Sequence, residues 1–375
     1  MRFRNHVLSV TASRWHSVVT TGLDVFIEAL PLTLVRQFAV RADERGVRTA
    51  WFPEITFADA FIPAAASAID TKRLRLATGV VGIWSRSPVV MALTAYTLHQ
   101  LGPGRSVLGL GLQAKPYVVN WHGEKYEKTV TAMREYVTIV RRILAGETVT
   151  FEGEVFRVKG FQIPMPPADP PIPIYVAAIG PKMTELAGEI ADGVFGFMHS
   201  LPYFRNVVVP AIRTGAARAG RSLDTFDLAV GFPAIVTADD SGIALNKGQI
   251  VMFATAMGSS RYYAESFTQA GFGNEVQRIQ ELVARGEMKK AIEVVSDEMC
   301  DALTLSGSPS RIYERIAAYR AAGATTVALN PSPPGVYFPL FQGHFPDNTE
   351  LPAFSFPDFL KSIGDAIDFI GESQH

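Results

Sequence analysis

Residues 172–198 read IPIYVAAIGPKMTELAGEIADGVFGFM, and this stretch decides the fold. An apolar run of strand composition extends from Ile172 to Gly180, and a second one starts at Gly193. Between them, Pro181 opens a helical pattern whose apolar residues return on one side of the helix. A strand, a helix and a second strand in this order predict one β–α–β unit of a parallel sheet.

The same alternation extends along the chain. Eight short runs are nearly continuously apolar, which is typical of parallel strands covered on both faces. These runs begin at Leu23, Thr49, Leu74, Ser106, Ile172, Gly193, Phe226 and Thr325. Further helical patterns open at Pro31, at Ser87–Pro88, near Met133 and at Ser308–Pro309. About eight strand–helix repeats predict an α/β fold, the (β/α)8 TIM barrel.

Two intervals are too long for simple crossovers. Residues 113–171, after strand four, hold a helix and then TVTFEGEVFRV, where Glu152–Gly153 resembles a hairpin turn. Residues 238–308, after strand seven, hold additional helical pattern. We interpret both as insertions on one barrel domain of residues 23–330. Residues 1–22 are then an N-terminal extension, and residues 331–375 a C-terminal segment that packs on the barrel.

Composition excludes several classes of protein. The chain has 375 residues, of which 48% are hydrophobic and 19% charged, and its net charge is −1. This balance predicts no nucleic-acid partner. The single cysteine, Cys300, excludes an internal disulfide framework, and the scattered histidines predict no metal site. The chain shows no signal-peptide core and no long apolar run, so we expect a cytoplasmic protein without a membrane partner.

Catalytic groups of such barrels lie where strands end. The strongest local signal is AAIGPKM, in which glycine permits close backbone approach and the free N–H groups of the following helix form an anion site. A cofactor phosphate would bind there, although a plain strand-to-helix turn is the alternative. The residues concerned are Ala178, Ile179, Gly180, Pro181 and Lys182.

Three further side chains are candidate catalytic residues. Glu54 ends an apolar strand, and a desolvated carboxyl group there would serve as an acid or proton relay; a carboxylate bonded to a neighbouring donor is the alternative. His122 and His199 lie in loops near the expected mouth, each either as a general base or as a structural or surface histidine. Gly109 and Gly111 lack the third glycine of a dinucleotide fingerprint, so they instead admit a flat ring or a neighbouring strand.

Five ordered blocks together resemble one family. They are ERGVRTAWFPE (44–54), LATGVVGIWSRSPVVMA (76–92), LHQLGPGRSVLGLGL (98–112), the stretch from NWHGEKY to FRV (120–158) and PIYVAAIGPKMTELAGEIADGV (173–194). The chain resembles the luciferase-like (bacterial luciferase superfamily) flavin and deazaflavin oxidoreductases, particularly the branch that uses coenzyme F420. The resemblance covers the chain from about Leu23 to Ala328.

The resemblance implies the parts of a cofactor site. It implies a non-proline cis peptide, Gly79–Val80, that supports the ring system at the end of strand three. It places the phosphate-bearing side chain at the start of the helix that follows Gly180. Gln113 lies beside the ring, where this chain departs from the family's usual Ser and Pro–Gln pair. Ile55 stands where sugar-phosphate dehydrogenases of the family have a histidine, so that substrate is not carried over.

Three functions follow. The first is an F420-dependent oxidoreductase that passes hydride to a small or mid-sized organic acceptor. The second is a monooxygenase of the same fold that uses reduced FMN and oxygen. The third is a cofactor-free barrel that acts as a binding or structural protein, which the open, glycine-rich strand ends disfavour. We expect a homodimer that acts on a small organic molecule.

Overall fold

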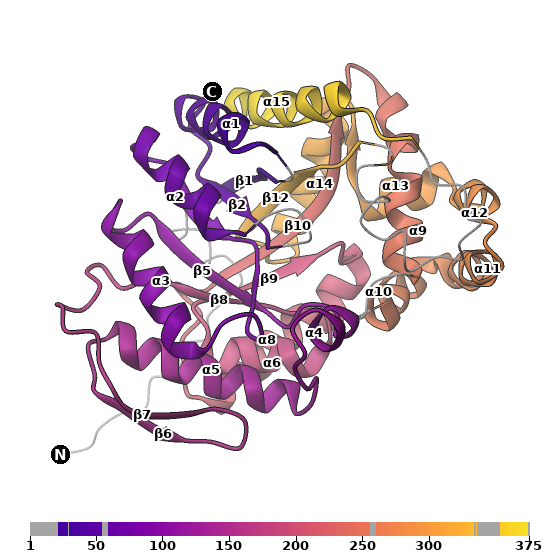
Figure 1. Ribbon diagram of the computed structural model, residues 1–375. Coiled ribbons are helices and arrows are strands. Elements are labelled where there is room, and N and C mark those ends of the chain that lie inside the picture. The colour runs from indigo at the N-terminus through magenta and orange to yellow at the C-terminus, as the bar shows by residue number, and fades with distance from the viewer. Residues whose placement is uncertain are drawn as a thin grey trace, which may run out of the picture.

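The computed structural model describes residues 22–28, 30–54, 59–255, 260–333, 335 and 353–373. Within these residues, eight parallel strands close into a barrel (Figure 1). In barrel order they are β1 (Gly22–Phe26), β2 (Thr49–Phe52), β3 (Arg75–Thr78), β5 (Ser106–Gly111), β8 (Ile174–Ala177), β9 (Gly193–Phe197), β10 (Asp227–Val236) and β12 (Thr326–Pro331). β12 pairs with β1 and closes the ring. The predicted TIM barrel is confirmed, and each of the eight predicted runs supplies one of these strands.

A covering helix follows each barrel strand in the described part of the chain. These helices are α1 (Leu32–Glu44), α2 (Phe61–Asp70), α3 (Pro88–Gln100), α5 (Thr129–Leu144), α6 (Pro181–Ile190), α8 (Val209–Arg218), α14 (Pro309–Ala321) and α15 (Phe356–Glu372). Local chemistry sets their starts. The Ser87 hydroxyl, for example, accepts a hydrogen bond from the backbone N–H of Val90, and Pro88 occupies the first position of α3.

The two long intervals add elements at the barrel's periphery. After β5 come α4 (Lys115–Asn120) and, beyond α5, the hairpin of β6 (Val149–Glu152) and β7 (Arg157–Phe161). After β10 come α9 (Lys247–Thr255), α10 (Ser260–Phe267), α11 (Gly273–Ala284), α12 (Met288–Val294), α13 (Asp297–Leu303) and β11 (Leu305–Gly307). In Figure 1 the hairpin lies beside α5, and α11 and α12 project away from the barrel.

The hairpin turn differs from the one predicted. Glu152 pairs with Arg157, so the turn spans residues 153–156 instead of Glu152–Gly153. Glu135 of α5 explains the longer turn, because its carboxylate accepts hydrogen bonds from the backbone N–H groups of Glu154 (2.7 Å), Val155 (3.0 Å) and Phe156 (2.9 Å). A turn that supplies three N–H groups to one carboxylate needs more than two residues.

Side chains fill the barrel interior. Large aromatic rings pack against one another inside the barrel, and those of Trp51 and Phe195 have centroids 4.5 Å apart. The interior cluster consists of Phe26, Trp51, Ala77, Val107, Tyr175, Phe195, Ala229 and Ala328. A packed interior leaves the two ends of the barrel as the places where a ligand can bind.

The described part of the C-terminal segment is α15, the helix that follows β12. It lies beside α1 (Figure 1), where Asp368 forms ion pairs with Arg41 and Arg45. No helix in the ranges given above is long and apolar enough to cross a membrane. The predicted N-terminal extension, residues 1–22, lies outside the described residues except for Gly22.

Candidate cofactor site at the carboxyl ends of the strands

The backbone at the end of β3 leaves the regular strand. The Gly79–Val80 peptide bond is cis, which confirms the bond expected from the family resemblance. Thr78 holds the departing backbone against β5, since its hydroxyl donates to the carbonyl oxygen of Gly109 (2.9 Å) and accepts from the N–H of Gly109 (2.8 Å). A side chain thus replaces the ladder hydrogen bonds where the β3–β5 pairing ends.

Two glycines of β5 form a notch for this segment. A Cβ atom at Gly109 would lie 2.1 Å from the Thr78 carbonyl oxygen, and one at Gly111 would lie 2.5 Å from Cγ2 of Val80. The glycines therefore admit a neighbouring strand, one of the two interpretations of the sequence. We call Gly79 and Val80, seated in this notch, the β3 shelf.

Two buried polar atoms without protein partners among the described residues belong to the segments that follow the β3 shelf and β5. Gln113 follows β5 with a left-handed backbone (φ 59°), and its side chain covers Gly82, where an added Cβ would lie 2.3 Å from the Gln113 Cδ. The buried Oε1 of Gln113 and the buried Nε1 of Trp84 make no hydrogen bond to any residue that the structure describes. Burying such a group unpaired costs about 1–3 kcal/mol, so a polar ring that pairs with the Gln113 oxygen fits this place.

Glu54 lies next to the β3 shelf, and its backbone N–H donates to the Val80 carbonyl oxygen (3.3 Å). Its side chain accepts a hydrogen bond from the Ser85 hydroxyl (2.8 Å) and pairs with the Arg86 guanidinium (2.5 Å). Arg86 also pairs with Asp59. These contacts match the alternative in which Glu54 is a carboxylate bonded to neighbouring donors.

The start of α6 joins the same end of the barrel, because β8 pairs with β5. No side chain caps this helix, and Lys182 in its first turn is exposed. The ring of Tyr262, from α10, covers Gly180: an added Cβ would lie 2.5 Å from the ring's Cζ. The sequence reasoning missed Tyr262, since no local pattern reports a contact with a residue about 80 positions away.

The backbone before α6 is firmly held. The N–H of Ala178 donates to the Phe195 carbonyl oxygen (3.1 Å), and the Ile179 carbonyl oxygen accepts from the Tyr203 hydroxyl (3.0 Å). The side chain of Ala178 is buried in the main core. Ala178 and Ile179 therefore position the turn through their backbone atoms.

His199 does not lie at the mouth, and that part of the prediction is corrected. Phe195 and Phe197 face the barrel interior, so Gly196 between them faces outward, and the His199 ring lies on it (2.5 Å from an added Cβ). His199 is completely buried, and neither ring nitrogen has a hydrogen-bond partner among the described residues. Burial lowers the pKa of His199 to about 3, which keeps the ring neutral.

The other predicted histidine is far more accessible. His122 is exposed after α4, and its backbone N–H donates to the Tyr117 carbonyl oxygen (3.3 Å). The structure thus places His122 on the surface and His199 between the sheet and its helices, and does not bring them together. In the described part of the chain, no three His, Cys, Asp or Glu side chains gather so that they could hold a metal ion.

Comparison with known proteins identifies the family. The model of the luciferase-like monooxygenase family matches residues 10–326, so the chain belongs to this family. A Mycobacterium tuberculosis protein provisionally named a coenzyme F420-dependent oxidoreductase is 29% identical over 310 residues, which span 78% of this chain and 89% of that protein. A 5,10-methylenetetrahydromethanopterin reductase of Archaeoglobus fulgidus is 32% identical over 262 residues, 69% of this chain and 77% of the reductase.

Solved structures share the fold. The F420-dependent tetrahydromethanopterin reductase of Methanopyrus kandleri matches with a TM-score of 0.75 at 22% identity, over 94% of this chain and 97% of that one. The FMN-bound oxygenating component of 3,6-diketocamphane monooxygenase from Pseudomonas putida matches with a TM-score of 0.61 at 18% identity, over 93% and 97%. The chain is an oxidoreductase of this family that depends on a deazaflavin or a flavin.

Proposed function

We propose that this protein uses reduced coenzyme F420 to transfer hydride to a small or mid-sized organic acceptor. The observation that carries the proposal is the β3 shelf in its glycine notch, at the same end of the barrel as the uncapped start of α6. The relatives named above for F420 or for a methanopterin substrate favour the deazaflavin over FMN. When bound, F420 supplies the hydride chemistry, and the protein supplies orientation and exclusion of water.

The residues of the site divide this work by their chemistry. Gly79 and Val80 support one face of the ring. Gln113 offers a side-chain carbonyl oxygen, and Trp84 offers an indole N–H group. Neither atom has a hydrogen-bond partner among the described residues. The backbone N–H groups that follow Gly180 and Pro181, together with the Lys182 ammonium group, hold the anionic side chain of the cofactor.

Among the predicted catalytic residues, Glu54 is the one whose backbone contacts the β3 shelf. We assign it the task of a carboxylate hydrogen-bond acceptor near the organic acceptor, with the Ser85 hydroxyl as its hydrogen-bonded neighbour. Arg86 keeps the carboxylate in place. His122 and His199 stay outside this assignment because of their positions on the surface and behind β9.

Direct titration tests the cofactor. The purified full-length protein is titrated with F420 and, separately, with FMN, and ligand fluorescence reports the dissociation constants. We expect F420 to bind more tightly. A tighter FMN complex would replace the proposal with the reduced-flavin monooxygenase, and failure to bind either would favour a cofactor-free barrel. A turnover screen with reduced F420 across carbonyl and conjugated compounds then identifies the acceptor class.

We also propose that two copies of the chain associate through α2 and α3. These neighbouring helices expose large apolar side chains at positions 62, 69, 90 and 93, Leu101 directly after α3 adds another, and Ile69 is 72% exposed. Within their own bounds, the two helices carry one formal charge, Asp70, which lies at the end of α2 and pairs with Arg36; Lys72, Arg73, Arg75 and Arg86 lie in the segment between the helices. Self-association of this surface would bury apolar area without burying an unpaired charge.

A further inference from the structure

A cavity of about 370 Å³ opens at the amino end of the barrel, opposite the β3 shelf. Its walls come from residues where strands begin: Arg75 is the first residue of β3, Asp227 the first of β10, and Tyr175 belongs to the start of β8. Arg48, which precedes β2, and Arg141 of α5 complete the charged part of the wall. None of these residues belongs to the cofactor site proposed above.

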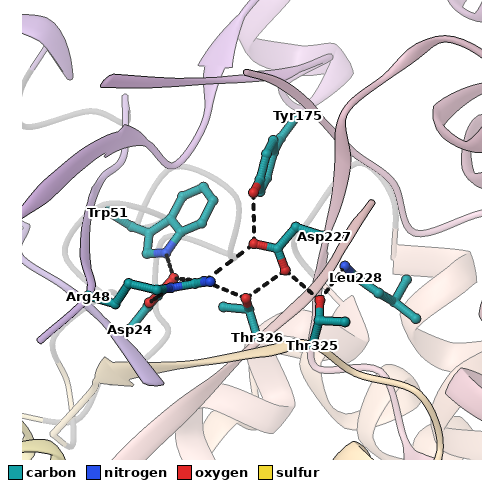
Figure 2. A network of polar contacts seen from close by, with 8 residues as sticks. All are labelled: Asp24, Arg48, Trp51, Tyr175, Asp227, Leu228, Thr325 and Thr326. Carbon is teal, nitrogen blue, oxygen red and sulfur yellow. Dashed lines mark hydrogen bonds and ion pairs between the residues drawn. The ribbon is translucent and has the colours of Figure 1, made fainter. Parts of the chain in front are cut away.

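A polar network (Figure 2) connects Arg48, Tyr175 and Asp227 of the lining to further polar residues. The Arg48 guanidinium lies 3.1 Å from the Asp24 carboxylate and 3.3 Å from the Asp227 carboxylate. Asp24 also accepts from the indole N–H of Trp51 (3.0 Å), and Asp227 from the Tyr175 hydroxyl (2.7 Å). Both carboxylates therefore have all the donors that they need within the protein.

Two threonine hydroxyls complete the surroundings of Asp227. Thr325 and Thr326 each donate to Oδ1 of Asp227 at 2.6 Å. Burial alone would raise the pKa of Asp227, but Arg48 and the hydroxyl donors outweigh it and hold that pKa below its usual value. Asp227 is thus a stable anion, and the single positive charge of Arg48 is shared between Asp227 and Asp24.

Asp192, the second aspartate of the cavity lining, is also paired. Asp192 accepts a hydrogen bond from the Arg141 guanidinium (2.9 Å) and another from the backbone N–H of Ile174 (2.8 Å). Arg221 lies 3.9 Å from its other oxygen. Asp192 is therefore already paired by donors of the protein and does not call for a bound cation.

Arg75 is the exception in this arrangement. Its side chain lines the cavity, and its charge acts on the Tyr175 hydroxyl. The Arg75 guanidinium nevertheless makes no hydrogen bond or ion pair with any residue that the structure describes. The lining and the charged residues paired with it contain four arginines (48, 75, 141 and 221) against three aspartates (24, 192 and 227), so one positive charge is in excess. A role in closing the barrel base accounts for Arg48 and Arg141 but not for Arg75.

We infer that this cavity binds a small organic anion with one negative charge, whose oxyanion pairs with Arg75. The neighbouring wall of Pro171, Ile172 and Pro173 would contact an apolar body attached to that oxyanion, and the Thr225 hydroxyl offers one more hydrogen-bond donor. A guanidinium binds carboxylate and phosphate through paired N–H groups, so both are ligands of this class.

Isothermal titration calorimetry on the full-length protein tests the site with two probes that share a phenyl ring, benzoate and phenyl phosphate. We expect saturable binding of at least one, weakened tenfold or more in Arg75→Gln. The single excess charge favours benzoate, and a tighter phenyl phosphate complex would identify the natural ligand as a phosphate ester. The matched control is Arg213→Gln, which removes an exposed arginine of α8 outside the cavity and should leave the affinity within twofold.

Two results would overturn the inference. One is the absence of saturable binding of either probe at millimolar concentration. The other is an equal affinity in wild type and Arg75→Gln, provided that circular dichroism shows the variant folded. Because the cavity and the β3 shelf lie at opposite ends of the barrel, the F420 titration of Arg75→Gln should match wild type. The two proposals therefore succeed or fail separately.

Discussion

At Gly111 an added methyl group would lie 2.5 Å from Cγ2 of Val80, so one atom decides whether the β3 shelf can sit on β5. We expect Gly111→Ala to lower the free energy of unfolding by about 1–3 kcal/mol, the usual cost of overpacking a buried contact. Val80→Ala in the same chain removes the obstructing carbon and should restore part of that loss. Urea denaturation of the two single variants and the double variant measures this; identical losses with and without Val80→Ala would contradict the notch.

Variants at Gly180 and Lys182 distinguish the contribution of the backbone to cofactor binding at the start of α6 from that of the lysine charge. Lys182→Ala should weaken cofactor binding by about 1 kcal/mol, the size of one partly solvated contact, whereas Gly180→Val should weaken it more than tenfold. A side chain at position 180 also displaces the Tyr262 ring. The double variant with Tyr262→Ala therefore serves as the control in the fluorescence titration. Loss that persists in the double variant supports direct obstruction, and full recovery would assign the effect to Tyr262.

His199 links stability to pH. Its pKa is about 3 in the folded protein and about 6.5 when exposed, so between these values the unfolded chain binds a proton that the folded chain does not. Stability should therefore fall as the pH drops below about 6.5, by at most about 1.4 kcal/mol per pH unit. In His199→Phe this contribution disappears, and the variant's free energy of unfolding should change less than that of wild type between pH 7 and pH 5. Parallel curves would mean that His199 is solvated or paired.

At the scale of elements, Glu135 ties the β6–β7 hairpin to α5 through three backbone N–H groups. Glu135→Ala leaves these N–H groups without their carboxylate, so we expect the hairpin to detach locally while the barrel stays folded. Hydrogen exchange of the amides at 154–156 should accelerate more than tenfold. Glu152→Ala is the control, because the Glu152–Arg157 pair is about three-quarters exposed and contributes little.

Strands were predictable from the sequence and several other elements were not. Each barrel strand is buried on both faces, so its sequence is a continuous apolar run, and this run is sufficient to predict the strand. Helix α2 was missed because its sequence, FIPAAASAID, has a proline near its start and no polar stripe. The hairpin turn was misplaced because Glu135, which organises it, lies 19 residues from Glu154. The cis bond came from family resemblance, and the cover of Gly180 by Tyr262 depends on a distant insertion.

For the whole molecule, the apolar surface of α2 and α3 predicts the oligomeric state. Ile69→Glu places a charge at the most exposed apolar side chain of this surface, where an associated pair would have to bury it unpaired. We expect wild type to have the mass of a dimer in light scattering coupled to size-exclusion chromatography, and Ile69→Glu that of a monomer with an unchanged circular dichroism spectrum. A wild-type monomer at micromolar concentration would refute the proposed association.

The pairing of β1 with β12 has a consequence for how the protein is made. Gly22 lies opposite Thr326 in this ladder, so the ribosome synthesises β1 about 300 residues before its partner β12. At 5–20 residues per second a ribosome needs roughly 15–60 s to cover that distance. Throughout this interval one edge of β1 has no strand beside it, which is the kind of edge that recruits strands from other chains. The yield of native protein should therefore rise when translation is faster or when a chaperone shields the nascent half-barrel.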